Sequence, residues 1–199
     1  MATRKGLFLF HEEENGRRVD EPPLRGRSEM GRAKAAAGSL LFLVVAPGVV
    51  AGLVPWWITG WHLREPLPHW IFPRIAGCLV LVAGVAALVQ AFARFVVEGV
   101  GTPAPVAPTE RLVVGGLYRY VRNPMYLAVA ATIVGQALLL GRLGLLLYAA
   151  AFIVVVVAFV RQYEEPTLAR RYGDEYAVYR RAVPGWWPRA RPWNAKRLR

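Results

Sequence analysis

Four long apolar stretches alternate with polar segments along the chain, at residues 33–57, 74–97, 124–140 and 145–160. About 20 mostly apolar helical residues cross the ~30 Å hydrocarbon core of a bilayer, and the first two stretches exceed that length. The last two are shorter and are separated only by Gly-Arg-Leu-Gly at 141–144, which predicts a tight turn between two helices. The pattern therefore predicts an all-α integral membrane protein with about four transmembrane helices, the last two forming a C-terminal helical hairpin.

Small and polar residues in the second apolar stretch predict how it packs. Gly77 and Gly84 lack side chains, so they allow a neighbouring helix to approach closely. Gln90 and Arg94 lie four residues apart and share a helix face. Arg94 either extends to the lipid headgroups or joins Gln90 toward the interior, and the sequence leaves both open.

The polar segments divide the chain into a cytoplasmic tail at 1–32, two transmembrane helices at 33–97, and a region at 98–199 that holds a loop, the hairpin and a cytoplasmic C-terminal segment. We expect one membrane domain overall. Three prolines exclude a continuous helix in the loop at 98–114, namely Pro103, Pro105 and Pro108.

An amphipathic helix is predicted at 166–181, because four large residues recur there at helical spacing opposite several arginines: Leu168, Tyr172, Tyr176 and Tyr179. We expect this helix to lie at the cytoplasmic membrane surface. Pro166 disfavours helical geometry at Glu165, which predicts that the helix breaks or restarts there. The tail at 183–199 carries Trp186, Trp187 and Trp193 among basic residues and suits anionic headgroups.

Composition and charge support the membrane interpretation. The chain is 55% hydrophobic with a mean hydropathy of +0.32, which is too apolar for an ordinary soluble domain. The formal net charge of +12 comes from basic residues at the edges of apolar stretches, so the positive-inside rule explains it better than nucleic-acid binding. Four spans with both termini in the cytoplasm satisfy this rule.

The sequence shows no pattern typical of a metal site or of a nucleotide-binding domain. Cys78 stands alone inside an apolar stretch, and the histidines, His11, His62 and His69, are not paired at ligand spacing. No glycine-rich phosphate loop follows a predicted strand. We therefore predict no metal site and no Rossmann domain.

Two polar segments flank the hairpin and are brought to the same side of the membrane by it. The first, at 115–126, reads Gly-Gly-Leu-Tyr-Arg-Tyr-Val-Arg-Asn-Pro-Met-Tyr, and the second, at 161–165, carries one arginine and two adjacent glutamates. The glycines allow close backbone approach to a ligand, and Tyr118, Asn123 and Tyr126 offer aromatic surface and hydrogen bonds. Each residue taken singly also fits a structural role, as a belt tyrosine, a helix cap or an interfacial charge.

The run at 112–126, followed by Arg161, Glu164-Glu165, Tyr172-Gly173-Asp174-Glu175-Tyr176, Tyr179 and Val183-Pro184, resembles the isoprenylcysteine carboxyl methyltransferase family. It is most similar to the bacterial branch, within the wider group that includes phospholipid N-methyltransferases. The resemblance implies an S-adenosylmethionine-dependent methyltransferase in the bacterial inner membrane, with its cofactor at the cytoplasmic face. The residues expected to contact the cofactor are Leu112, Val113, Tyr118, Asn123, Pro124, Met125, Tyr126 and Glu165.

The resemblance also implies a lipophilic acceptor, which would be the carboxylate of a prenylcysteine-like or other lipid-like acid. Arg161 would orient such a carboxylate bidentately. A phospholipid amine would instead have to lose a proton, for which Glu164 is the expected base. Many family members have histidine where this chain has Asn123, so a hydrogen-bonding role is retained there but a titrating one is not. An NADPH-dependent membrane reductase of related architecture and a non-enzymatic scaffold that binds anionic lipid remain alternatives.

Overall fold

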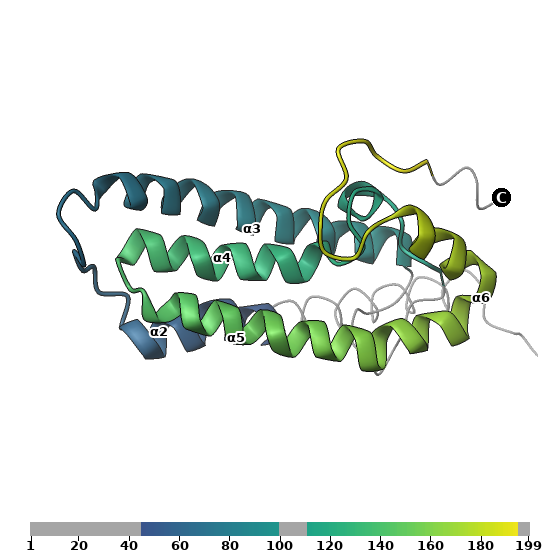
Figure 1. The fold of residues 1–199 in the computed structure, drawn as a ribbon, viewed down its shortest axis with the longest axis horizontal. Coiled ribbons are helices and arrows are strands. Elements are labelled where there is room, and N and C mark those ends of the chain that lie inside the picture. Colours follow the sequence, from purple (N-terminus) through teal and green to yellow (C-terminus); the bar gives the residue numbers. More distant parts are fainter. Residues whose placement is uncertain (1–44, 100–110, 195–199) are drawn as a thin grey trace, which may run out of the picture.

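Three long helices lie side by side in the computed structural model, which describes residues 45–99 and 111–194 (Figure 1). They are α3 (Ile71–Gly99), α4 (Pro124–Leu140) and α5 (Gly144–Phe159), and α4 lies between the other two. The other elements lie toward the two ends of this bundle: η1 (Val49–Leu53) and α2 (Val54–Thr59) on one side, and η2 (Gly116–Arg119), η3 (Val160–Glu164) and α6 (Glu165–Ala182) on the other. The described elements are all helical, in agreement with the predicted class.

The outer surface of the bundle is apolar. The central helix α4 buries ten of its 17 residues, whereas Leu79 on α3 and Leu147 on α5 are 67% and 77% exposed. Two described helices, Ile71–Phe95 and the one that starts at Gly144, are long and apolar enough to cross a membrane, and Val45–Thr59 and Pro124–Leu140 are shorter. These faces suit hydrocarbon, and the count of four spans stays a prediction.

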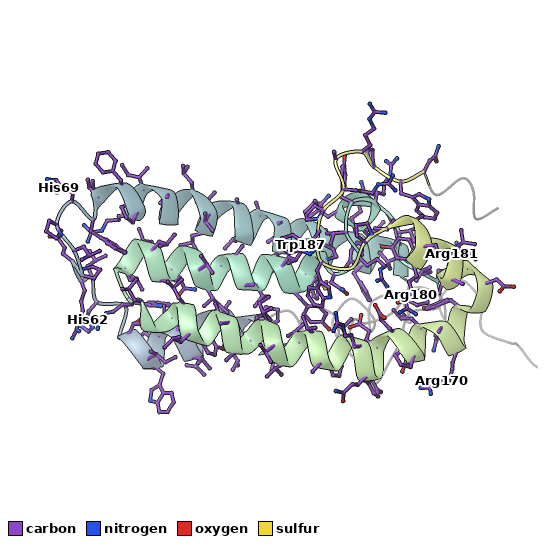
Figure 2. All side chains as sticks on the ribbon, viewed as in Figure 1. His62, His69, Arg170, Arg180, Arg181 and Trp187 are labelled. Atoms are coloured by element: carbon purple, nitrogen blue, oxygen red, sulfur yellow. The ribbon has the colours of Figure 1, made fainter. Side chains whose placement is uncertain are left out.

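The tail at 1–32, the start of the first apolar stretch and most of the loop at 98–114 lie outside the described residues. The two ends of the described bundle differ in charge. Figure 2 shows His62 and His69 at one end, and Arg170, Arg180 and Arg181 at the end that carries α6. Under the positive-inside rule this second end is the one expected to face the cytoplasm.

Glycines let α3 and α4 approach at backbone distance, as the sequence predicts. A Cβ atom at Gly84 would lie 2.9 Å from the Thr132 nitrogen, and one at Gly135 would lie 2.7 Å from the Leu81 Cα. A Cβ at Gly77 would lie 2.9 Å from the Gly135 carbonyl oxygen. No side chain fits at these positions without moving a helix, so the three glycines fix the distance between α3 and α4.

Pro55 explains how the first helical segment is attached to the bundle. Proline has no N–H, so it cannot donate to a carbonyl one turn earlier, and the chain forms a wider π-helical turn at Val49–Leu53. Side chains from the bundle bond to carbonyls of that turn. Gln136 Nε2 donates to the Ala51 oxygen at 2.6 Å, and the Tyr148 hydroxyl donates to the Val50 oxygen at 2.8 Å. The segment is thereby fixed against α4 and α5.

The predicted break at Glu165 is wrong. Glu165 has helical φ and ψ of −60° and −44°, and α5 continues through η3 into α6. The turn before Pro166 is wound as a π-helix, whose wider geometry accommodates the proline ring without ending the helix. The change of direction comes later, at Gly173, where φ is 48° and ψ is −123°.

Candidate active site

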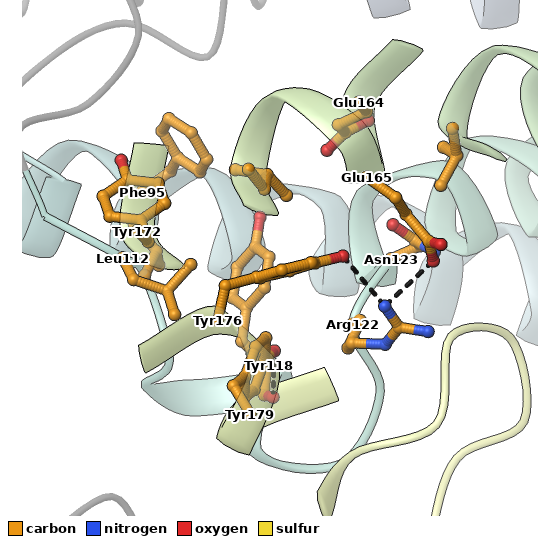
Figure 3. A pocket seen from close by; sticks show the side chains of 13 residues that line it. Phe95, Leu112, Tyr118, Arg122, Asn123, Glu164, Glu165, Tyr172, Tyr176 and Tyr179 are labelled. Atoms are coloured by element: carbon orange, nitrogen blue, oxygen red, sulfur yellow. Dashed lines mark hydrogen bonds and ion pairs between the residues drawn. The ribbon is translucent and has the colours of Figure 1, made fainter. Parts of the chain in front are cut away.

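A pocket lies at the end of the bundle where α3, the segment before α4, η3 and α6 meet (Figure 3). Its empty volume, counted out to the open side, is about 560 Å³. Aromatic and aliphatic side chains form most of its wall, and the charged groups are one arginine and two glutamates. The lining residues are Phe95, Leu112, Val113, Tyr118, Arg122, Asn123, Val160, Glu164, Glu165, Leu168, Tyr172, Tyr176 and Tyr179.

Gly115 and Gly116, at the start of η2, bring the backbone close to α3. The Gly115 N–H donates to Glu98 Oε2 at 2.8 Å. Gly116 has a positive φ of 54°, and a Cβ there would lie 2.8 Å from Arg94 Cγ and 2.9 Å from Gln90 Nε2. The glycine pair therefore makes its close approach to α3. Gln90 and Arg94, which share a face of α3, lie against this pair.

Residues 183–194, which we call the C-terminal strap, hold the segment between η2 and α4 in place. The Arg122 N–H donates to the Pro184 oxygen at 2.9 Å, and Asn123 Nδ2 donates to the Gly185 oxygen at 3.1 Å. Further along, the Trp193 N–H donates to the Arg119 oxygen at 2.9 Å, and Arg119 Nε donates back to the Trp193 oxygen at 2.7 Å. Asn123, the position of the family histidine, thus binds the strap with its amide nitrogen.

The tyrosine face of α6 and one tryptophan of the strap are buried in the protein, and the position of α6 at the membrane surface stays a prediction. Tyr176, Tyr179 and Trp193 are buried together, with exposures of 2%, 3% and 7%. The Tyr179 hydroxyl donates to the Tyr118 carbonyl oxygen at 2.7 Å. The tyrosine face of α6 therefore covers the pocket, and Trp193 packs in the protein instead of meeting headgroups.

Tyr118 is enclosed by this packing. Its ring lies 6.4 Å from that of Phe95, centroid to centroid, and the residue is 7% exposed. Burial raises the pKa of the Tyr118 phenol well above its usual value, and the neighbouring Tyr179 adds to the effect. The phenol therefore keeps its proton, and with it a hydrogen that it can donate, well above neutral pH.

Glu165 is neutralised by two arginines. Its Oε1 lies 2.9 Å from Arg122 Nη1, and both side chains are only 14% exposed. Its Oε2 lies 3.0 Å from Nη2 of Arg180, which is 55% exposed. Arg122 Nη1 also donates to the Tyr176 hydroxyl at 3.0 Å, while its buried Nε has no hydrogen-bond partner among the described residues. Arg122 thus links the segment before α4 to two positions of α6, Glu165 at its start and Tyr176 further along it.

Glu164 has different surroundings. Its Oε2 accepts a hydrogen bond from the Tyr126 hydroxyl at 2.9 Å. The Tyr126 ring lies 6.5 Å from that of Trp186, centroid to centroid. No arginine or lysine in the described part of the chain forms an ion pair with Glu164, so its carboxylate is the one available to a ligand in the pocket.

Six of the ten residues predicted for the site line this pocket: Leu112, Val113, Tyr118, Asn123, Glu164 and Glu165. The other four lie outside its wall. Pro124 and Met125 begin α4 directly after Asn123, and Tyr126 reaches the site through Glu164. Arg161 is exposed on η3 and does not line the pocket.

Arg122 and the α6 tyrosines are the polar site residues that the sequence did not identify, and the apolar ones are Phe95, Val160 and Leu168. Arg122 lies within the conspicuous run at 115–126 but counts there only as a positive-inside charge. The spacing of Tyr172, Tyr176 and Tyr179 correctly predicts that they share a helix face. Such a face suits the membrane surface and a pocket equally, so the spacing does not distinguish the two. The sequence signal for the ion pair is an arginine in the first polar segment and two adjacent glutamates in the second, since the hairpin brings both segments to the same side.

The fold and the site define a helical membrane protein with a polar and aromatic pocket at one end of its apolar bundle. Residues 72–175, just over half of the chain, match the family model of phospholipid methyltransferases. The chain belongs to the phospholipid methyltransferase family, and it is a membrane methyltransferase that acts on lipid-like substrates. A search of curated proteins finds no match. The isoprenylcysteine carboxyl methyltransferases are related to this family, and the assignment to their branch stays a prediction.

Proposed function

We propose that the chain transfers the methyl group of S-adenosylmethionine to a lipophilic acceptor at the cytoplasmic face of a bacterial inner membrane. The observation that carries the proposal is the pocket in which the two polar segments of the sequence meet, since it combines aromatic walls with a carboxylate that has no cation partner among the described residues. Membership of the phospholipid methyltransferase family supports it.

The lining fits such a cofactor. Leu112, Val113 and Tyr118 offer apolar and aromatic surface for the adenine ring, and Asn123 and the glutamates offer hydrogen bonds for hydroxyl and ammonium groups. When bound, S-adenosylmethionine supplies a methyl group on a positively charged sulfur. Because Glu165 is already neutralised by arginines, Glu164 is the side chain that would complement a positive charge.

The acceptor is proposed to be a lipid-like carboxylate that enters from the bilayer. A carboxylate already carries its nucleophilic oxygen, so the protein has to position it and exclude water. Arg161 is exposed on η3, one turn before Glu165 on the same continuous helix. An arginine there can meet an acid whose apolar tail remains in lipid, and can hold it bidentately.

A phospholipid amine is the second candidate, and the position of Glu164 favours it. Glu164 lines the pocket, whereas Arg161 does not. An ammonium acceptor must lose a proton before it can attack, and a partly buried carboxylate beside the cofactor is suited to take it.

The cofactor is tested by calorimetric titration of S-adenosylmethionine into detergent-purified protein. We expect saturable binding that Glu164→Gln weakens by about tenfold, the size expected for loss of a charged partner. Glu175→Gln is the matched control, because Glu175 is an exposed glutamate on α6 outside the pocket. Absence of binding to folded protein would refute the proposal.

The acceptor is tested by measuring turnover of lipid acids and lipid amines by Arg161→Ala. With a carboxylate acceptor we expect kcat to fall by roughly thirtyfold while cofactor affinity is unchanged, because one charge-assisted contact is lost. The control is Arg170→Ala, an exposed arginine on α6. Full activity of Arg161→Ala on amines, together with inactivity of wild type on acids, would assign the second candidate.

A further inference from the structure

Two adjacent tryptophans in the C-terminal strap have different surroundings. Trp187 is 83% exposed, whereas Trp186 is partly buried with its ring against Tyr126, at 6.5 Å between centroids and an interplanar angle of 33°. This separation lies within the range of interacting aromatic pairs. The strap follows the region that the family model covers, so the family assignment says nothing about Trp186.

The strap is anchored on both sides of Trp186. The Gly185 oxygen accepts from Asn123 Nδ2 at 3.1 Å, and the Arg189 N–H donates to the Tyr120 oxygen at 3.0 Å. Trp186 therefore cannot move away from α4 without breaking one of these bonds. The Trp186 ring, held in this place, limits the movement of the Tyr126 ring.

The restricted ring carries the donor to Glu164. A tyrosine hydroxyl has one hydrogen to donate, and the Tyr126 hydroxyl directs it to Glu164 Oε2 at 2.9 Å. That bond sets the orientation of the carboxylate, and therefore the direction in which its other oxygen faces. A carboxylate that contacts a ligand must be held to within a few tenths of an ångström to act efficiently.

We propose that Trp186 is a positioning residue of the active site: by packing on Tyr126, it keeps the Tyr126 hydroxyl on Glu164 and so orients the Glu164 carboxylate in the pocket. The inference rests on the proposed function for its catalytic consequence. It assigns the C-terminal strap a part in the chemistry, although Trp186 itself does not line the pocket.

The proposal predicts a loss of turnover together with weaker cofactor binding. Trp186→Ala is expected to lower kcat by about tenfold, the effect expected from loss of one aromatic pair, and to raise the KM for the cofactor in the same direction as Glu164→Gln. Trp187→Ala should behave as wild type, and Trp186→Phe, which retains a ring, should recover most of the rate. The double variant Trp186→Ala/Tyr126→Phe should be no slower than Tyr126→Phe alone, because Trp186 acts through Tyr126.

A ligand-free measurement makes the test independent of the cofactor. The infrared difference between wild type and Glu164→Gln identifies the carboxylate band of Glu164. We expect Trp186→Ala to shift this band in the same direction as Tyr126→Phe, and Trp187→Ala to leave it unchanged. An unshifted band, or equal kcat in Trp186→Ala and Trp187→Ala, would overturn the proposal. A shifted band in protein that does not bind S-adenosylmethionine would refute the proposed function and leave the Trp186–Tyr126–Glu164 link supported.

Discussion

Arg122→Ala is expected to lower the free energy of unfolding by about 3 kcal/mol and to abolish cofactor binding. The side chains of Arg122 and Glu165 are each 14% exposed, and their atoms lie 2.9 Å apart. Removing the arginine leaves a largely buried carboxylate with only one, exposed, cation partner, and it also removes the donor to Tyr176. Breaking such a pair costs more than the pair contributes, because the remaining charge is poorly solvated. Denaturant titration in detergent measures the loss of stability.

The control for this prediction uses the same glutamate. Arg180 contacts Glu165 Oε2 at 3.0 Å but is 55% exposed, so Arg180→Ala should cost less than about 1 kcal/mol. Arg122→Lys should fall between the two, since lysine keeps the charge but has a shorter side chain than the one that places Nη1 on both Glu165 and Tyr176. Equal effects of Arg122→Ala and Arg180→Ala would contradict the assigned burial of the pair.

Gly135→Ala is expected to destabilise the bundle by about 3 kcal/mol, although alanine favours helices more than glycine does. The added Cβ would lie 2.5 Å from the Leu81 nitrogen and 2.7 Å from the Leu81 Cα. Both are backbone atoms, so a rotamer change cannot relieve the contact. The helices α3 and α4 would have to separate, and every contact between them would weaken. Thermal unfolding in detergent measures the effect.

Gly144→Ala provides the comparison within the same hairpin. A Cβ at Gly144 meets no atom within 4 Å, and the residue begins α5. Its substitution should therefore be neutral, or stabilising by a few tenths of a kcal/mol. If Gly135→Ala were equally harmless, the close α3–α4 packing would not exist in the folded protein.

The helical hairpin could be predicted closely because its boundaries depend on local residues. Pro124 suits the first turn of a helix, and Gly141 adopts the left-handed conformation that ends one, with φ of 67°. Both bounds of α4 therefore coincide with the predicted 124–140. The bounds of α3 lie a few residues beyond the predicted 74–97, because Pro73 fits in the first helical turn and the helix continues through Glu98 and Gly99.

The site could be predicted only in part, because its parts lie far apart in the sequence. The sequence indicates that the two polar segments meet, since the hairpin returns the chain to the same side. It does not indicate which glutamate Arg122 neutralises, because Glu164 and Glu165 are adjacent and differ only in the helix face they occupy. Nor does it predict the continuous helix at Pro166, since a π-helical turn has no simple sequence signal.

The contacts of the C-terminal strap also bear on the order of events during synthesis. Arg119, Tyr120, Arg122 and Asn123 bond to residues between Pro184 and Trp193, which the ribosome adds after all the described helices. A nascent chain can thus insert its hairpin in the membrane before the pocket has its final shape. The pocket should therefore reach its final shape only once Trp193 has left the ribosome.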